Sequence, residues 1–326
     1  MKKIANLAVL AALACAASAF AEPSGTVMMY SSMQEKQLVA IREGFEKKYP
    51  GVKMEYYFAG TGKVMTKIAT EAQAGHVDAD VLWVGDPTNY VQFKAQGILE
   101  QYMSPETEFI DKAFVDPEGY YTGARMMNMG IAYNTKAVKG DDIPKTWNDL
   151  LDKKWDGALV MTDPNTAGTT KYWRNAMMAN PKYGVKFFEG LKANGCKMAS
   201  GTTATHNEIA AGEYDVGVCL DYVTENIKEK GSPIEFVYPE ETVSIFSPIG
   251  LVKNAKNMEN GKLLYDFILS KEGQEIIVAQ NLLSVRAGIE QKADVAAIAA
   301  KAMASDMKDV VEKEAESKAA FDKIFR

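Results

Sequence analysis

Short apolar runs alternate with helical patterns along the first part of this chain, and this alternation most constrains its fold. Strand-like runs at 25–30, 52–58 and 80–84 are separated by two segments with helical spacing of apolar residues. The connecting loops are short. Strands and helices that alternate in this way predict an α/β fold with a largely parallel sheet.

Each of these strands ends in a loop of small, polar residues, and a fourth such loop follows the apolar run at 157–160. In open α/β sheets, ligands bind at the carboxyl ends of the strands. Where a helix follows the loop, its first N–H groups and positive dipole end favour an anion. One loop alone indicates only a helix N-cap, but four favour a shared cleft. The candidate ligand-binding residues of these loops are Ser31, Ser32, Thr61, Gly62, Asp86, Thr166, Gly168, Thr169 and Thr170.

The middle of the chain adds further candidates at two more strand ends. Strands are predicted at 126–134, 196–199 and 214–220. His206 and Asn207 are predicted to lie in the loop before a helix at 207–211. Asp221 and Tyr222 follow the strand at 214–220. A further strand is predicted at 245–252, and residues 261–326 are predicted to be mostly helical.

The N-terminus has the pattern of a secretory signal peptide: a basic start, a short apolar core and a small-x-small cleavage site. We predict cleavage after Ala21, which leaves 305 residues with a formal net charge of −8. A lipid anchor on Cys15 is the less favoured alternative. The protein is therefore expected in the periplasm. Its acidic balance argues against nucleic acid or an anionic membrane as the main partner.

The exported chain retains two cysteines, Cys196 and Cys219. Export permits a disulfide, but the pattern favours free, buried thiols. No C-x-x-C or His-rich spacing indicates a metal site, and no cofactor is expected.

Several ordered runs together resemble one family. The runs are Tyr30-Ser31-Ser32, 59–62, Asp80-Val81 before Asp86, 130–134, 144–147 with Leu150, Trp155 and Gly157, and Asp163-Pro164 with Gly168-Thr169. In these runs the chain resembles the type II periplasmic substrate-binding proteins of ABC importers, in the branch of extracellular solute-binding family 1 that contains ferric-iron, hexose-phosphate and 2-aminoethylphosphonate binders.

The resemblance implies two α/β lobes joined by two crossover segments, with a ligand cleft between the lobes and mixed, mostly parallel sheets flanked by helices. The crossovers are expected near 123–127 and 244–247. Lobe one would then comprise 22–125 and 246–326, and lobe two 126–245. The resemblance also implies closure around the ligand by hinge motion, a membrane permease as partner, and a monomer.

Two ligand classes remain open. Iron binders of this branch use two adjacent tyrosines, where this chain has Asp221 and Tyr222, and many also use a first-loop histidine that is missing here. If iron binds, Tyr222, Asp221 and His206 are its expected ligands. The favoured ligand is a small phosphorylated organic anion, a hexose phosphate or a phosphonate such as 2-aminoethylphosphonate. Thr169 would then hold the phosphoryl group and Asp221 the other end.

An enzyme is the competing class of function. Ser32, His206 and Asp221 could be assembled into a catalytic set, but no nucleophile-elbow, zinc-protease or phosphate-loop motif is present. We therefore expect a binding protein without catalytic activity. Arg125 and Arg286 could face the cleft or form surface ion pairs, and the sequence leaves this open.

Overall fold

The computed structural model describes residues 22–304 and 307–326, so the predicted signal peptide lies outside the described residues. The described residues contain one sheet of nine strands. The strands are β1 (Gly25–Ser31), β2 (Val52–Phe58), β3 (Val81–Trp83), β4 (Thr122–Asn134), β5 (Leu159–Thr162), β6 (Lys197–Ala199), β7 (Val216–Leu220), β8 (Ile234–Val237) and β9 (Val243–Leu251).

Helices separate or follow most of these strands, in agreement with the alternation in the sequence. The helices are α1 (Glu35–Lys48), α2 (Thr61–Gln73), α3 (Thr88–Ala95), α4 (Gly168–Ala179), α5 (Gly184–Ala193), α6 (Thr202–Ala211), α7 (Asp221–Lys228), α8 (Met258–Leu269), α9 (Lys271–Val278), α10 (Val295–Ala300), α11 (Met307–Glu312) and α12 (Glu314–Phe325). Short 3-10 segments occur at η1 (Pro105–Phe109), η2 (Lys112–Phe114), η3 (Gly140–Asp142), η4 (Trp147–Leu151) and η5 (Lys153–Trp155).

The sheet is mixed, as predicted, and its parallel pairs lie at its two ends. Its order is β2-β1-β3-β9-β4-β7-β5-β6, with β8 also paired to β4. Strands β2, β1 and β3 are parallel, and so are β7, β5 and β6. The long strands β4 and β9 pair antiparallel with each other and with their outer neighbours.

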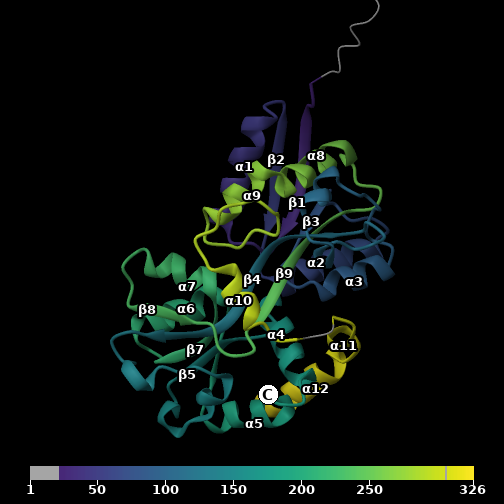
Figure 1. Cartoon of the computed structure of the whole chain (residues 1–326). Helices are drawn as coiled ribbons and strands as arrows, with labels where there is room; N and C mark the ends of the chain where they lie inside the picture. Colours follow the sequence, from purple (N-terminus) through teal and green to yellow (C-terminus); the bar gives the residue numbers. More distant parts are fainter. Residues whose placement is uncertain (1–21, 305–306) are drawn as a thin grey trace, which may run out of the picture.

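Figure 1 shows two lobes joined through β4 and β9. Lobe one contains β1–β3, α1–α3, α8 and α9, and lobe two contains β5–β8 and α4–α7. Strands β4 and β9 pair from Thr122 opposite Ile249 to Met129 opposite Val243. The predicted crossover segments, 123–127 and 244–247, lie inside this paired region. The lobe boundaries in the sequence stay a prediction.

The C-terminal helices make contacts with elements of both lobes. Helices α8 and α9 pack against β1, β9 and α1. Helix α12 instead packs against α4 and α5, and α11 contacts both α3 and α4 (Figure 1). Phe321 of α12 is fully buried and its ring packs edge-on against Phe188 of α5.

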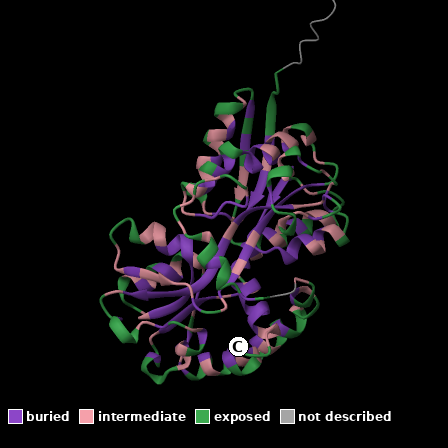
Figure 2. Cartoon of the chain, viewed as in Figure 1, coloured by how far each residue is buried: buried purple, intermediate pink, exposed green. Residues whose placement is uncertain are grey.

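The core follows the central strands through both lobes (Figure 2). Every residue of β5 and β7 is buried, as expected for parallel strands covered by helices on both faces. Three tryptophans, Trp83, Trp147 and Trp173, are fully buried, and Trp147 packs against Trp173. Cys196 and Cys219 are free and buried, as the sequence favoured.

The two lobes touch at the tips of the loops that end β2 and β5. A Cβ added to Gly62 would lie 2.4 Å from the Asn165 carbonyl oxygen, and one added to Gly168 would lie 3.0 Å from the Thr61 side chain. At Gly62 the neighbouring atom belongs to the backbone, so a side chain there would force the two backbones apart. The small residues of these loops therefore end the strands and also allow the two lobes to come into contact.

Candidate functional site

A cleft of about 920 Å³ lies where the predicted polar loops of the two lobes face each other. Lobe one contributes the loops after β1 and β2 and the start of α2. Lobe two contributes the starts of α4 and α6 and the end of β7. Seven of the predicted residues line this cleft: Ser32, Thr61, Gly62, Thr166, Gly168, Thr169 and Tyr222.

Three helices begin at the cleft wall. Helix α2 begins at Thr61, α4 at Gly168 and α6 at Thr202. The first N–H groups of a helix have no partner within the helix and carry a partial positive charge. The start of each helix therefore offers hydrogen-bond donors to an anion in the cleft.

Three predicted residues support the cleft without lining it. Ser31 is fully buried, and its hydroxyl donates to the Trp83 carbonyl and accepts from the Met33 N–H. Thr170 is buried on the inner side of α4. Asp86 is also fully buried, and its carboxylate lies 2.7 Å from the ammonium of Lys171.

The Asp86–Lys171 pair joins the loop after β3 in lobe one to α4 in lobe two. Lys171 also pairs with Glu314 of α12, at 3.1 Å, and donates to Asn89 of α3. Burial alone would lower the pKa of Lys171, but the two carboxylates outweigh it and raise that pKa. The charge of Asp86 is thus compensated within the protein.

His206 and Asn207 do not belong to the cleft, and the predicted loop around them is wrong. Helix α6 begins five residues before the predicted start, at Thr202, and places both residues inside the helix. His206 is buried, with Nδ1 2.7 Å from the Thr202 carbonyl and Nε2 accepting from the Leu220 N–H. Burial lowers the pKa of His206, which fits a neutral ring that donates from Nδ1. His206 holds α6 against β7.

The early start of α6 has a tertiary cause. The Thr205 hydroxyl lies 2.7 Å from that of Thr162 in β5 and also bonds the Gly201 carbonyl. These contacts offset the modest helix propensity of threonine. Residues Ser200 to Ala204 consequently line the cleft, and the sequence analysis missed them as ligand-binding candidates.

Asp221 also faces away from the cleft. Its carboxylate accepts from the Asn128 backbone N–H at 3.1 Å, from the Asn128 amide at 2.7 Å and from the Tyr222 N–H at 2.8 Å. Side chains alternate between the two faces of a strand, so Met127 lines the cleft whereas Asn128 turns to the opposite face. Asp221, which is bonded to Asn128, lies on that opposite face and lines a second, separate cavity.

Arg125 of β4 is the residue that the sequence left undecided and that the structure places in the cleft wall. It is almost fully buried, its Nη1 donates to the Gln37 side chain, and its guanidinium lies over the Trp83 ring. Its Nε has no hydrogen-bond partner in the described part of the chain. Burial lowers the pKa of Arg125, partly offset by Tyr222 and Tyr90. Arg286, by contrast, pairs with Glu106 outside the cleft.

The charge of Arg125 is left uncompensated among the described residues. No carboxylate there pairs with it, and the two charged side chains that line the cleft, Lys63 and Arg125, are both cationic. A charged residue in an otherwise apolar and small run, Gly123-Ala124-Arg125-Met126-Met127, is the signal that could have identified it. The cleft is therefore an electropositive site.

The catalytic set considered from the sequence is not assembled. Ser32 lines the cleft, and its hydroxyl accepts from the Gly85 N–H. Both ring nitrogens of His206 and the carboxylate of Asp221 are engaged with other groups, as described above.

Across residues 22–304 and 307–326, no helix is long and apolar enough to cross a membrane.

Comparison with known families agrees with this geometry. The model of the bacterial extracellular solute-binding proteins matches residues 79–309. The chain belongs to this family. Members with this fold are two-lobed type II periplasmic binding proteins that serve as the substrate-binding components of ABC importers.

The relatives of this solute-binding protein include one that is named for a ligand. An uncharacterized protein of Haemophilus influenzae is 31% identical over 280 residues, which are 82% of this chain and 79% of the relative. A putative 2-aminoethylphosphonate-binding periplasmic protein of Salmonella typhimurium is 28% identical over 83% of this chain and 82% of its own length.

Solved structures show the same fold. The periplasmic binding protein AfuA from Actinobacillus pleuropneumoniae, with fructose-6-phosphate bound, is 28% identical. It superimposes with a TM-score of 0.81 over 92% of this chain and 98% of its own. Iron-bound HitA from Pseudomonas aeruginosa is 21% identical, with a TM-score of 0.82 over 93% of this chain and 100% of its own. The names of these relatives place this solute-binding protein among periplasmic proteins.

Proposed function

We propose that this protein captures a small phosphorylated organic anion in the cleft and delivers it to the membrane permease of an ABC importer. The observation that carries the proposal is Arg125, a buried guanidinium in the cleft wall with no carboxylate partner among the described residues. A buried charge that is not paired is costly to the folded protein. An anion in the cleft would remove that cost and would be bound more tightly for doing so.

The donors around Arg125 suit a phosphoryl group. Three helix N-termini reach the cleft, and their N–H groups are oriented before the ligand arrives. Lys63 adds a second positive charge at the wall. A planar guanidinium binds phosphate oxygens through two parallel hydrogen bonds, which one ammonium cannot do.

The residues around the rest of the cleft favour an organic part with hydroxyl groups over one with an ammonium. The described residues of the wall include the hydroxyls of Ser32, Thr202 and Tyr222 but no carboxylate. Asp221, which we expected to hold the far end of the ligand, lines the other cavity. A hexose phosphate is therefore preferred to 2-aminoethylphosphonate, whose ammonium would have no acidic partner in the cleft.

Ferric iron is the alternative, and the placement of its expected ligands gives it less support. Tyr222 lines the cleft, whereas His206 and Asp221 are turned to other partners. Among the described residues, no group of three His, Cys, Asp or Glu side chains is arranged to hold a metal ion. Iron would then depend on Tyr222 together with ligands that do not come from the predicted set.

The remaining parts of the proposal follow from the family and the sequence. We expect the signal peptide to be removed after Ala21, the mature protein to act as a periplasmic monomer, and the cleft to close on its ligand by hinge motion. We expect no catalytic turnover, so incubation with a sugar phosphate should release no inorganic phosphate.

Titration calorimetry with four ligands tests the proposal. Fructose 6-phosphate, 2-aminoethylphosphonate, inorganic phosphate and ferric citrate are compared on the wild type and on Arg125→Met. Arg286→Met is the matched control, because Arg286 pairs with Glu106 outside the cleft. We expect fructose 6-phosphate to bind most tightly, and Arg125→Met alone to lose it. Binding of ferric citrate alone would reject the proposal in favour of iron.

A further inference from the structure

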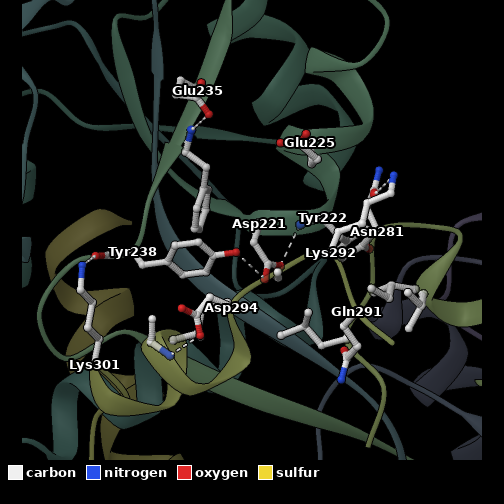
Figure 3. Close-up of a pocket in the computed structure, with 17 residues that line it drawn as sticks. Asp221, Tyr222, Glu225, Glu235, Tyr238, Asn281, Gln291, Lys292, Asp294 and Lys301 are labelled. Carbon is white, nitrogen blue, oxygen red and sulfur yellow. Dashed lines mark hydrogen bonds between the residues drawn. The ribbon is translucent and has the colours of Figure 1, made fainter. Parts of the chain in front are cut away.

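A second cavity, of about 410 Å³, lies on the face of β4 to which Asn128 points, opposite the cleft. Figure 3 shows the residues that line it. Its walls come from α7 and β8 of lobe two and from the segment between α9 and the end of α10. Most of the lining is apolar or aromatic, including Phe236, Tyr238 and Leu282. Tyr222 alone lines both this cavity and the cleft.

Asp221 is a buried carboxylate in the wall of this cavity. Its side chain lies at the cavity wall (Figure 3), and the residue is only 6% exposed. Neutral groups of Asn128 and Tyr222 hold its two oxygens, and the Tyr238 hydroxyl lies 3.5 Å away. Across residues 22–304 and 307–326, no cation pairs with it. Burial raises the pKa of Asp221 to about 6, although these hydrogen bonds oppose that change.

Among the described residues, the two cations that line the cavity, Lys292 and Lys301, bond to groups other than Asp221. Lys292 pairs with Glu229, and the ammonium of Lys301 donates to the Tyr238 carbonyl. The acidic residues of the rim are more numerous. The carboxylates that line the cavity are Asp221, Glu225, Glu235 and Asp294.

We propose that this cavity is a second binding site, which takes a small organic cation that has an apolar body. The ammonium would pair with Asp221, and the apolar body would pack against Phe236, Tyr238 and the aliphatic floor. A cation near aromatic rings gains further attraction from their faces. Because neutral donors already fix the carboxylate, the site loses little freedom on binding. This inference does not depend on the ligand of the cleft.

The first experiment is calorimetry with benzylammonium as the probe at neutral pH. Benzyl alcohol, which has the same body without the charge, is the comparison ligand. We expect benzylammonium to bind at millimolar or lower concentration, at least tenfold more tightly than benzyl alcohol, and to do so equally in the presence of fructose 6-phosphate. Equal affinity of the two probes, or no heat from benzylammonium at millimolar concentrations, would overturn the proposal.

Two variants locate the probe. Asp221→Asn removes the charge, and we expect at least a tenfold loss of benzylammonium affinity. Because that change also alters contacts to Asn128, Ala297→Trp provides a second route: Ala297 lies at the rim on α10, away from the Asp221 hydrogen bonds. Its indole would fill the cavity mouth and abolish binding. Ala296→Trp, one residue away on the same helix and outside the lining, is the matched control and should bind normally. Normal benzylammonium binding to Ala297→Trp would place the probe elsewhere and refute the site.

Discussion

The cleft and the cavity behind it contain buried charges of opposite sign, and neither charge has an ion-pair partner among the described residues. Arg125 lies in the cleft wall, and Asp221 lies in the cavity wall on the other face of the crossover strands. One step along the chain separates the two faces: Met127 points to the cleft, whereas Asn128 and its partner Asp221 point away. The comparison teaches that adjacent residues of one strand can belong to two different sites, because their side chains point to opposite faces.

A third buried charge shows the contrasting case. Asp86 is as buried as Arg125, but it pairs with Lys171 at 2.7 Å, and Lys171 pairs in turn with Glu314. Compensated charges of this kind hold the architecture together. Uncompensated charges remain available to a ligand. The following predictions use this difference, from the largest expected effect to the smallest.

Removing the cation of the compensated pair should cost the most stability. Lys171→Met leaves Asp86 buried and unpaired, and breaking a buried pair in this way costs about 3–5 kcal/mol. Urea denaturation should show this decrease in the free energy of unfolding. Lys318→Met is the control, since Lys318 makes an exposed pair with Asp322, and such pairs contribute less than about 1 kcal/mol. Equal effects of the two substitutions would contradict the assignment of Lys171.

Removing the uncompensated cation should have the opposite pattern. Arg125→Met should weaken organic phosphate binding by about 2–5 kcal/mol, or roughly 30-fold or more, because it removes a buried charge partner of the ligand. The unfolding free energy without ligand should fall less than for Lys171→Met, since only the Gln37 side-chain oxygen loses a partner and no carboxylate is left behind. Calorimetry and urea denaturation measure the two effects. A variant that unfolds more easily but binds normally would show that Arg125 is structural.

Contact between the lobes should be sensitive to one methyl group. The Cβ of Gly62→Ala would meet the Asn165 carbonyl oxygen at 2.4 Å, and overpacking of this kind costs about 1–3 kcal/mol. Ligand affinity should fall about tenfold, and small-angle scattering should no longer show a decrease in radius of gyration when ligand is added. Gly201→Ala is the control, because nothing lies within 4 Å of its added Cβ. Normal closure of Gly62→Ala would reject this contact.

Binding of benzylammonium in the second cavity should depend on pH, because Asp221 must be ionised to pair with it. Burial raises the pKa of Asp221 to about 6, so protons compete with benzylammonium below that pH. Affinity should be constant above pH 7 and fall by roughly tenfold per unit well below the pKa of Asp221. The groups that face Asp221 or line the same cavity are Asn128, Tyr222, Glu225, Glu235, Tyr238, Gln291, Lys292, Asp294 and Lys301. Calorimetry between pH 5 and 8 measures this dependence, and a flat profile would show that Asp221 does not bind the probe.

The sign of this titration also bears on stability. The folded protein holds a proton on Asp221 more strongly than the unfolded chain does, because burial raises the pKa from 3.8 to about 6. The contribution of Asp221 to folding is therefore most favourable below pH about 4 and is lost as the pH rises through about 6. A bound cation would restore that loss at neutral pH. This linkage is a physical reason for a cation to favour the cavity.

The sequence by itself determined the α/β class and the family, whereas the antiparallel pairing of β4 and β9 at the centre of the sheet came from the structure. Apolar periodicity gives the order of strands and helices, and the polar loops at strand ends identify most of the cleft wall contributed by α2 and α4. These features are local: a few neighbouring residues decide a strand end or a helix start. Thr61, Gly62, Gly168 and Thr169 were found in this way and line the cleft.

Only the tertiary structure decided which way the remaining polar side chains point. His206 and Asp221 have the composition of ligand-binding residues, but contacts with Leu220 and Asn128 turn them away from the cleft. Arg125 lies in a strand whose sequence does not reveal which face is buried against lobe one. These orientations depend on pairings between residues that are 14 to 93 positions apart in the chain. Such long-range pairings leave no periodic trace in the sequence, so they became visible only when the strands were placed side by side.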